Sequence, residues 1–444
     1  MNWRRGRKTM RNKRLNFGAL SIAVLLLGGC ALNPATGKKD LNLIPVSTQE
    51  EVEMGREAFG MAVQQMGGPY PDPRLAAYVS GVGRRLAAAS HRPDLEYRFE
   101  VINDSVPNAF ALPGGFVAIN RGLLAGLENE AQLAAVLGHE VGHVTARHGV
   151  QGMQRGALFG AALSVLSAAT RDSAYGGIAQ QAGQLAAGLI NNTYSREQER
   201  ESDHLGIEYM VQAGYDPTGA VQLQEYFYSR LEGGQDPSWV TGLFRTHPFS
   251  RERLENNRRD IARTYGHSLD NPAYALGEKE FMEATARLRA AQEGYRLMNQ
   301  ALELKKQGRA AESLNMLLEA AIAAPDESLI LTRLGMAYLD AGDRSAALRH
   351  LRSAVRLDGK YFLTRFALGY GLLQAGEATE AAAHLEKSRE LLPTLVAGFY
   401  LASAWEKTGR LEQAIRLYKN VAEQDASGDL GKKAAARLLA LGAK

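Results

Sequence analysis

The C-terminal third of the chain repeats itself at a nearly constant spacing. Four turn-like segments, QGRAAESL, AGDRSAAL, AGEATEAA and TGRLEQAI, follow one another at steps of 34, 34 and 33 residues, with glycines at Gly308, Gly342, Gly376 and Gly409. Apolar helical stretches precede the last three glycines at 333–339, 367–373 and 401–407. Such a period predicts stacked helix pairs, because one pair alone cannot bury its apolar face.

The repeated segment over about 290–425 resembles the tetratricopeptide repeat. This resemblance implies an α-solenoid whose concave surface binds peptides or proteins and catalyses no reaction itself. The last helical stretch, GKKAAARLLAL (431–441), is then a capping helix. We therefore predict a repeat domain over 291–441, with an irregular helical bundle as the alternative.

The N-terminus has the parts of a bacterial export signal. Residues 1–29 contain seven Lys and Arg, no acidic residue and the apolar run ALSIAVLLL (19–27). That run is shorter than the roughly 20 residues that span a bilayer as a helix. The boundary LGGC (27–30) resembles a lipoprotein box, which implies cleavage before Cys30 and its diacylation. An ordinary signal peptide cut nearby and an uncleaved anchor are the alternatives.

The lipoprotein interpretation also predicts where the protein resides. Cys30 is the only cysteine, so the chain forms no internal disulfide. Two or three acyl chains anchor a protein stably where one does not. By resemblance to sorted lipoproteins, Ala31 after the cysteine favours the outer membrane. We expect a periplasmic protein that is held at the membrane through Cys30, with the polar residues 30–50 as a tether.

The charge of the chain argues against one class of partner. The net charge of +4 includes the seven basic residues of 1–29, so the remainder carries a net charge of −3. Proteins that bind nucleic acids usually show a basic excess on one face. We therefore expect no nucleic-acid partner. The length of 444 residues is enough for two or three domains.

Residues 51–268 form the other predicted domain, and 269–290 a linker helix. Helical patterns dominate the domain, with strands predicted at YRFEVIN (97–103) and GGFVAIN (114–120) and a loop, DSVPNAFALP, between them. The second strand suits a sheet edge that pairs with an extended substrate, or is purely structural. Residues 149–192, rich in Gly, Ala and Gln, are interpreted as a packed helical hairpin, a mobile lid or an interfacial helix.

The stretch GHEVGHVTARHG contains the most distinctive cluster of polar residues. Apolar spacing predicts a helix over 131–148, on which His139 and His143 share a face one turn apart. Two neutral imidazoles at this spacing bind Zn²⁺ at about 2.0–2.1 Å. Glu140, next to the first histidine, is placed to accept a proton from metal-bound water. His148 follows His143 by five residues, so we expect it to point away and to be structural.

Two glycines in this helix predict a close neighbour. Gly138 and Gly142 each cost about 1 kcal/mol of helix propensity against alanine. Their presence predicts that another element approaches the helix on that side.

A catalytic zinc usually takes a third protein ligand. The candidate segment is SREQERESDHLGIEYM (195–210), in which Glu199 and Asp203 are four residues apart and share a helix face. Glu199 would complete the metal site, and Asp203 would accept a hydrogen bond from a ligand histidine. Glu197 and Glu201 are rivals for the ligand role, although only Glu199 has an aspartate four residues later. Taken alone, this acidic stretch is more typical of a solvated helix face.

Four motifs in one order resemble those of a zinc metallopeptidase family that includes HtpX, the CAAX prenyl endopeptidases and the periplasmic BepA-type proteases. They are NAFALPGGFVAINRGLL (108–124), HEVGH (139–143), ERESD (199–203) and THPFSRER (246–253). The repeats and the export signal narrow the resemblance to the BepA-like branch, over about 50–440. It implies a mainly α protein: a zincin-like domain with a small β-sheet, followed by the α-solenoid. It also implies one Zn²⁺ per chain, held by His139, His143 and Glu199.

The same resemblance suggests roles for two later residues. The late histidine of the family maps onto His247, and its arginine six residues further on maps onto Arg253. Both would contact the scissile carbonyl or its oxyanion. Alternatively, His247 would act as a fourth ligand that displaces the nucleophilic water and keeps the enzyme latent, or would only order the loop before Pro248. The sequence lacks the multiple membrane spans of the prenyl and HtpX branches, so their membrane-embedded substrates do not carry over.

The predicted function is that of an envelope zinc metalloendopeptidase. It would hydrolyse misfolded or stalled outer-membrane and periplasmic proteins, with Glu140 as the general base. The repeats would recruit unfolded or assembling outer-membrane proteins, or the outer-membrane assembly machinery. The alternative is a chaperone or assembly scaffold in which peptidase activity is secondary or latent. A degenerate peptidase is disfavoured because every expected chemical residue is present.

Overall fold

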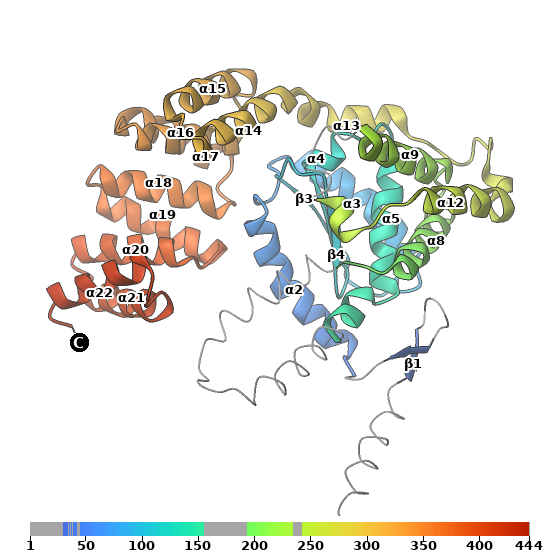
Figure 1. The fold of residues 1–444 in the computed structure, drawn as a ribbon, viewed down its shortest axis with the longest axis horizontal. Helices are drawn as coiled ribbons and strands as arrows, with labels where there is room; N and C mark the ends of the chain where they lie inside the picture. The colour runs from blue at the N-terminus through green and yellow to red at the C-terminus, as the bar shows by residue number, and fades with distance from the viewer. Residues whose placement is uncertain are drawn as a thin grey trace, which may run out of the picture.

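The computed structural model describes residues 45–154, 193–233 and 242–443, together with some residues of 30–41. The predicted signal peptide and residues 155–192 of the predicted hairpin or lid lie outside the described residues. Figure 1 shows two parts, with a small sheet surrounded by helices on the right and a curved stack of helix pairs on the left. Near the start of the chain, β1 (Cys30–Leu32) pairs antiparallel with β2 (Lys39–Leu41).

The N-terminal part is built from helices whose starts the sequence specifies. Ser47 and Ser195 each begin a helix with a capping box, and Asn129 and Ser250 each accept a hydrogen bond from a backbone N–H of the first turn. The helices are α2 (Thr48–Gln65), α3 (Pro73–Ala88), α4 (Arg121–Leu124), α5 (Glu130–Thr145), α8 (Arg196–Gln212), α9 (Thr218–Gly233), α11 (Leu243–Thr246), α12 (Arg251–Thr264), the 3₁₀ turn η1 (Gly266–Ser268) and α13 (Glu278–Ala290).

The sheet has three strands in the order β3-β5-β4. The central strand β5 (Phe116–Asn120) runs parallel to β3 (Arg98–Ile102) and antiparallel to β4 (Ala109–Leu112). Two predictions were therefore wrong. GGFVAIN supplies the central strand rather than an edge, and DSVPNAFALP contains a strand rather than only a loop. Gly114 and Gly115, at φ +81° and +99°, make the tight turn that lets these two segments pair.

The C-terminal part consists of antiparallel helix pairs, which confirms the predicted α-solenoid. The turn glycines of the repeats all have φ between +79° and +89°, a conformation in which glycine alone is unstrained. The helices are α14 (Gln292–Lys306), α15 (Ala310–Ala323), α16 (Ser328–Asp340), α17 (Arg344–Leu357), α18 (Phe362–Gln374), α19 (Ala378–Leu391), α20 (Leu395–Lys407), α21 (Leu411–Gln424) and α22 (Asp429–Ala440).

One apolar core joins the two parts. It extends from the sheet through α3, α5 and α8 into the first repeat helices and includes Val117, Leu133, Tyr209, Tyr295 and Leu334. Because these side chains are buried together, the first repeats are packed on the N-terminal part rather than held by a free linker.

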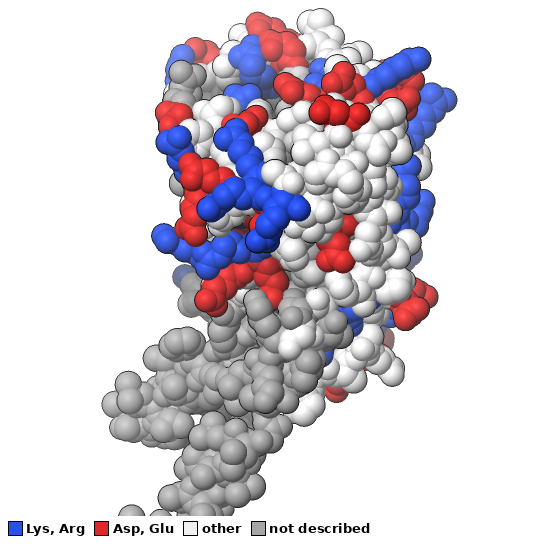
Figure 2. Space-filling model, turned by 90° about the vertical axis from the view of Figure 1, so that its right-hand side faces the viewer, with Lys and Arg blue, Asp and Glu red and all other residues white. Residues whose placement is uncertain are grey.

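The surface near α8, α9 and α12, at the right of Figure 1, faces the viewer in Figure 2. Basic and acidic side chains are interspersed there, next to a broad area without charged side chains. Within the described parts of the chain, no helix combines the length and apolar character that a membrane span requires.

Candidate metal centre

Helices α5 and α8 cross at closely spaced small residues. A Cβ atom at Gly138 would lie 3.0 Å from the carbonyl oxygen of Gly206, and one at Gly142 would lie 3.0 Å from that of Ser202. The predicted approach of another element to these glycines is thus confirmed. The crossing brings the two histidines of α5 against the acidic face of α8.

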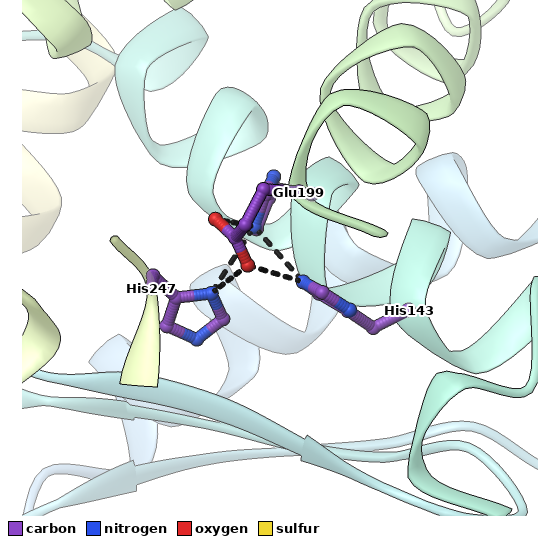
Figure 3. A group of neighbouring side chains, drawn as sticks. His143, Glu199 and His247 are labelled. Carbon is purple, nitrogen blue, oxygen red and sulfur yellow. Dashed lines mark hydrogen bonds and ion pairs between the residues drawn. The ribbon is translucent and has the colours of Figure 1, made fainter. Parts of the chain in front are cut away.

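Four side chains converge at this crossing. His139, His143, Glu199 and His247 each offer one nitrogen or oxygen atom, and these atoms all lie within 4.8 Å of one another. His143 Nε2 is 3.0 Å from His139 Nε2 and 3.4 Å from Glu199 Oε1. Figure 3 shows Glu199 between His143 and His247, which come from opposite sides. This donor set of imidazoles and one carboxylate fits the ligand preference of Zn²⁺.

Asp203 and Arg253 lie directly behind these donors. Asp203 Oδ1 is 3.0 Å from His139 Nδ1. Arg253 donates two hydrogen bonds of 2.8 Å to Asp203, a third to Glu199, and a fourth of 2.9 Å to the carbonyl oxygen of Pro248. The side chains of Glu199, Asp203 and Arg253 are all buried. The guanidinium therefore faces the two carboxylates and a backbone carbonyl, and it orients both acidic residues of the site.

The charges of the site favour ionised carboxylates and a neutral ligand histidine. Burial would raise the pKa of Glu199, but Arg253 and the nearby histidines outweigh it and hold this pKa well below the ordinary value. In the same way, Arg253 and His139 overcome burial and lower the pKa of Asp203 to about 2. Burial lowers the pKa of His143 well below its ordinary value. A deprotonated carboxylate and an uncharged imidazole are the forms that bind a metal.

Glu140 and His247 face each other across the site. His247 Nδ1 lies 3.0 Å from Glu199 Oε1 and 3.3 Å from His139 Nε2, while its Nε2 lies 3.5 Å from Glu140 Oε1. Burial raises the pKa of Glu140, and the carboxylates of Glu199 and Glu140 outweigh burial to raise that of His247. The other carboxylate oxygen of Glu140, Oε2, is buried without a hydrogen-bond partner among the described residues.

His148 does not point away from the site, so that prediction was wrong. Helix α5 ends at Thr145, and Arg147 adopts φ +57°, which turns the chain back. As a result, His148 Nδ1 lies 2.9 Å from His143 Nδ1. The prediction failed because it extended one regular helix to residue 148. Sequence spacing gives no signal for a left-handed residue that is not glycine.

The two rival acidic residues are not near the converging donors. Glu197 is exposed, and Glu201 contacts His148 Nε2 at 3.0 Å. Tyr194, which the sequence did not single out, stacks on the ring of His143 with centroids 3.8 Å apart. Cys30, the predicted lipidation site, lies at the start of β1, in register with Leu41.

An apolar pocket adjoins the donors. Its lining includes His139, Glu140 and His247, with the remaining wall mostly apolar, such as Val136, Met210, Leu223, Phe227 and Phe244. Leu243 N donates a hydrogen bond of 2.9 Å to the carbonyl oxygen of Pro107, just before the edge strand β4. The segment that carries His247 is therefore attached to the sheet beside the start of β4.

Comparisons with known proteins identify metallopeptidases to which this chain is similar. Residues 73–260 match the model of peptidase family M48. The chain is 28% identical to the beta-barrel assembly-enhancing protease of Escherichia coli (strain K12), over 95% of this chain and 94% of that protein. It is 34% identical to the mitochondrial metalloendopeptidase OMA1 of Schizosaccharomyces pombe, over 50% of this chain and 63% of that protein. The first TPR domain of Spaghetti (RPAP3), a solved structure, is 21% identical, with a TM-score of 0.26 over 27% of this chain and 95% of that chain.

Proposed function

Because residues 73–260 are a peptidase family M48 domain and the chain is thereby a metallopeptidase, we propose that it is a zinc-dependent endopeptidase of the bacterial envelope. The observation that carries this proposal is the convergence of His139, His143 and Glu199 beside the buried carboxylate of Glu140. Three ligands of this kind leave a fourth position for water, as in catalytic zinc sites.

We assign the proton transfers to Glu140. A bound zinc ion would polarise the scissile carbonyl and acidify the attacking water. Glu140 takes the proton of that water and delivers it to the leaving amine. Burial raises its pKa above the ordinary value of a glutamate, which makes its carboxylate a stronger base. Because β5 lies between β3 and β4, an extended substrate would pair with an edge strand, and we propose β4 because it contacts helix α5.

Glu140→Gln tests this assignment. Gln keeps the size of the side chain but cannot accept the proton. The variant should lose peptide hydrolysis by more than about 100-fold and keep bound metal. Hydrolysis at the wild-type rate by a metal-loaded Glu140→Gln protein would remove Glu140 from the mechanism.

His247 is proposed to hold the resting enzyme latent. Its Nδ1 lies among the metal-binding atoms, and its Nε2 faces Glu140, so the side chain occupies the space between the ligands and the base. A fourth protein ligand there would displace the nucleophilic water. His247→Ala should therefore increase proteolysis. Unchanged or lower proteolysis would assign His247 to oxyanion binding or to ordering the loop before Pro248.

The proposed substrates are misfolded or stalled outer-membrane and periplasmic proteins, recruited by the repeats. This proposal is supported by the similarity over nearly the whole chain to a protease whose name describes assistance to β-barrel assembly. Anchoring at the outer membrane would depend on diacylation of Cys30. Cys30→Ser should abolish incorporation of labelled fatty acid and move the protein from the membrane fraction to the soluble periplasmic fraction. A membrane-bound Cys30→Ser protein would contradict the anchor.

A chaperone or assembly scaffold is the second candidate, because the repeats form a stack of helix pairs that contributes no residue to the metal-binding cluster. The two functions predict different outcomes when the Glu140→Gln protein is expressed in a cell that lacks the gene. Rescue by the Glu140→Gln protein would favour the scaffold, whereas failure of that protein at wild-type abundance would favour proteolysis.

A further inference from the structure

We propose that His148 and Glu201 are positioning residues that hold the metal ligand His143 through a relayed hydrogen-bond chain. This inference rests on the metal site of the proposed function. His148 Nδ1 lies 2.9 Å from His143 Nδ1, and His148 Nε2 lies 3.0 Å from Glu201 Oε2. His143 and His148 are both buried, so bulk solvent does not compete for the hydrogen bonds of their ring nitrogens.

Metal binding sets the direction of every hydrogen bond in this chain. The nitrogen of His143 that faces the other donors is Nε2, so this atom must carry the free lone pair. His143 Nδ1 then carries the proton and donates it to His148 Nδ1. With its Nδ1 as an acceptor, a neutral His148 carries its proton on Nε2 and donates it to the carboxylate of Glu201. Ser202 Oγ, 3.4 Å from His148 Nδ1, is the other polar neighbour of that acceptor.

The two ligand histidines are thus supported differently. His139 donates directly to a carboxylate, that of Asp203, which Arg253 also holds. For His143, the imidazole of His148 is inserted between the ligand and its carboxylate. Tyr194 packs on the ring of His143 at a centroid distance of 3.8 Å. Hydrogen bonds fix the edge of this ring and stacking fixes its face, so the lone pair of Nε2 keeps one direction.

The relay explains why Glu201 carries an acidic side chain although it is not a ligand. Glu199 and Glu201 lie two residues apart on α8, so their side chains leave the helix in different directions. Glu199 reaches the donor cluster, whereas Glu201 reaches the far side of His148. Support of a ligand histidine by a carboxylate orients the ring and typically changes metal affinity by 10–100-fold.

Metal affinity of the full mature chain tests this proposal, measured by competition with a chromophoric zinc chelator. His148→Leu removes the acceptor for His143 Nδ1 and should weaken zinc binding about 10–100-fold. His148→Asn restores an acceptor oxygen near the position of Nδ1 but does not reach Glu201, so it should lose less affinity than His148→Leu. A residue that only fills space would show the opposite order, because Leu is closer to His in volume than Asn is.

Glu201→Ala keeps the test decisive if His148→Leu does not fold. It should weaken zinc binding several-fold, while the matched variant Glu197→Ala, at an exposed position of the same helix, should bind zinc like the wild type. Equal affinity of the Glu201→Ala, Glu197→Ala and wild-type proteins would overturn the relay. Failure of the wild type itself to bind zinc would instead overturn the proposed function.

Discussion

At the scale of single residues, Arg253 decides how the acidic part of the site is held. It was expected to contact the reacting carbonyl, and the structure shows where its hydrogen bonds go: to Glu199, Asp203 and the carbonyl oxygen of Pro248. A buried cation between two buried carboxylates offsets one of their two negative charges before any metal binds. We therefore infer that Arg253 acts by positioning the ligand Glu199 and its neighbour.

Arg253→Met should destabilise the protein and weaken metal binding. The substitution keeps the apolar stem but leaves two buried carboxylates without a cation, a change that costs about 3–5 kcal/mol in comparable buried pairs. The midpoint of thermal unfolding and the zinc affinity should both fall. Arg251→Met is the control, because Arg251 is exposed and pairs with Glu255, one helical turn away. Equal unfolding midpoints for the two variants would contradict this role.

The pH dependence of stability gives a second residue-scale prediction. The pKa of Asp203 is about 2 in the folded protein and 3.8 as its ordinary value. Its ionised form therefore stabilises the fold above about pH 4, by about 2 kcal/mol, and this contribution disappears as the pH falls through about 2. The unfolding midpoints of metal-free wild type and Asp203→Asn should differ most near neutral pH and converge in acid. A gap that widens in acid would contradict the sign of this shift.

At the scale of elements, the crossing of α5 and α8 places the proposed ligands. Histidines at residues 139 and 143 come from one helix and the carboxylate from the other, so their distance depends on how closely the helices approach. A Cβ atom at Gly206 would lie 2.8 Å from the backbone nitrogen of His139 and 2.9 Å from the carbonyl carbon of Gly138. Both neighbours are backbone atoms, so the helices themselves would have to separate.

Gly206→Ala should accordingly weaken zinc binding and lower stability by about 1–3 kcal/mol, the usual effect of overpacking. Gly81→Ala is the matched control, because Gly81 also lies within a helix but has no atom within 4 Å of an added Cβ. Alanine there should leave zinc affinity unchanged and raise stability by up to about 1 kcal/mol. If Gly206→Ala bound zinc as tightly as Gly81→Ala does, the metal site would tolerate a separation of α5 and α8.

Elements with strong local signals could be predicted from the sequence. Features that tertiary contacts determine could not. The regular glycines predicted the helix pairs, and the glycines of α5 predicted the close crossing. Strand order was not predictable, because Ala109–Leu112 and Phe116–Asn120 are both buried and carry no alternation that distinguishes an edge from a centre. The position of His148 depends on a left-handed arginine, which local preferences disfavour.

At the scale of the whole molecule, a buried polar junction joins the repeats to the N-terminal part. The guanidinium of Arg121 lies 3.3 Å from the ring centroid of Tyr295, a helix α14 residue. Tyr295 donates a hydrogen bond of 2.6 Å to Glu327, and Tyr70 of the N-terminal part donates one of 3.1 Å to the same carboxylate. Gln64 forms a second link between the two parts. Its side chain donates a hydrogen bond to the carbonyl oxygen of Lys360 and accepts one from the backbone N–H of Phe362. The array is therefore fixed in orientation relative to the site.

Glu327→Ala should weaken this junction, because it leaves two buried tyrosine hydroxyls without their acceptor. Each unsatisfied buried group costs about 1–3 kcal/mol. The variant should unfold at lower temperature than Glu319→Ala, which changes an exposed glutamate of α15. Limited proteolysis should also cut between the N-terminal part and the repeats sooner in Glu327→Ala. Identical cleavage and unfolding of the two variants would mean that the junction does not hold the parts together.

We propose that side chains from two helices hold one divalent ion for peptide hydrolysis. The metal content of the purified mature protein, measured by elemental analysis beside that of Glu199→Gln, tests this proposal. We predict about one zinc per chain in the wild type and a strongly reduced content in Glu199→Gln, with hydrolysis lost in parallel. Full zinc occupancy in Glu199→Gln, or a wild type that cleaves peptides after complete removal of metal, would contradict it.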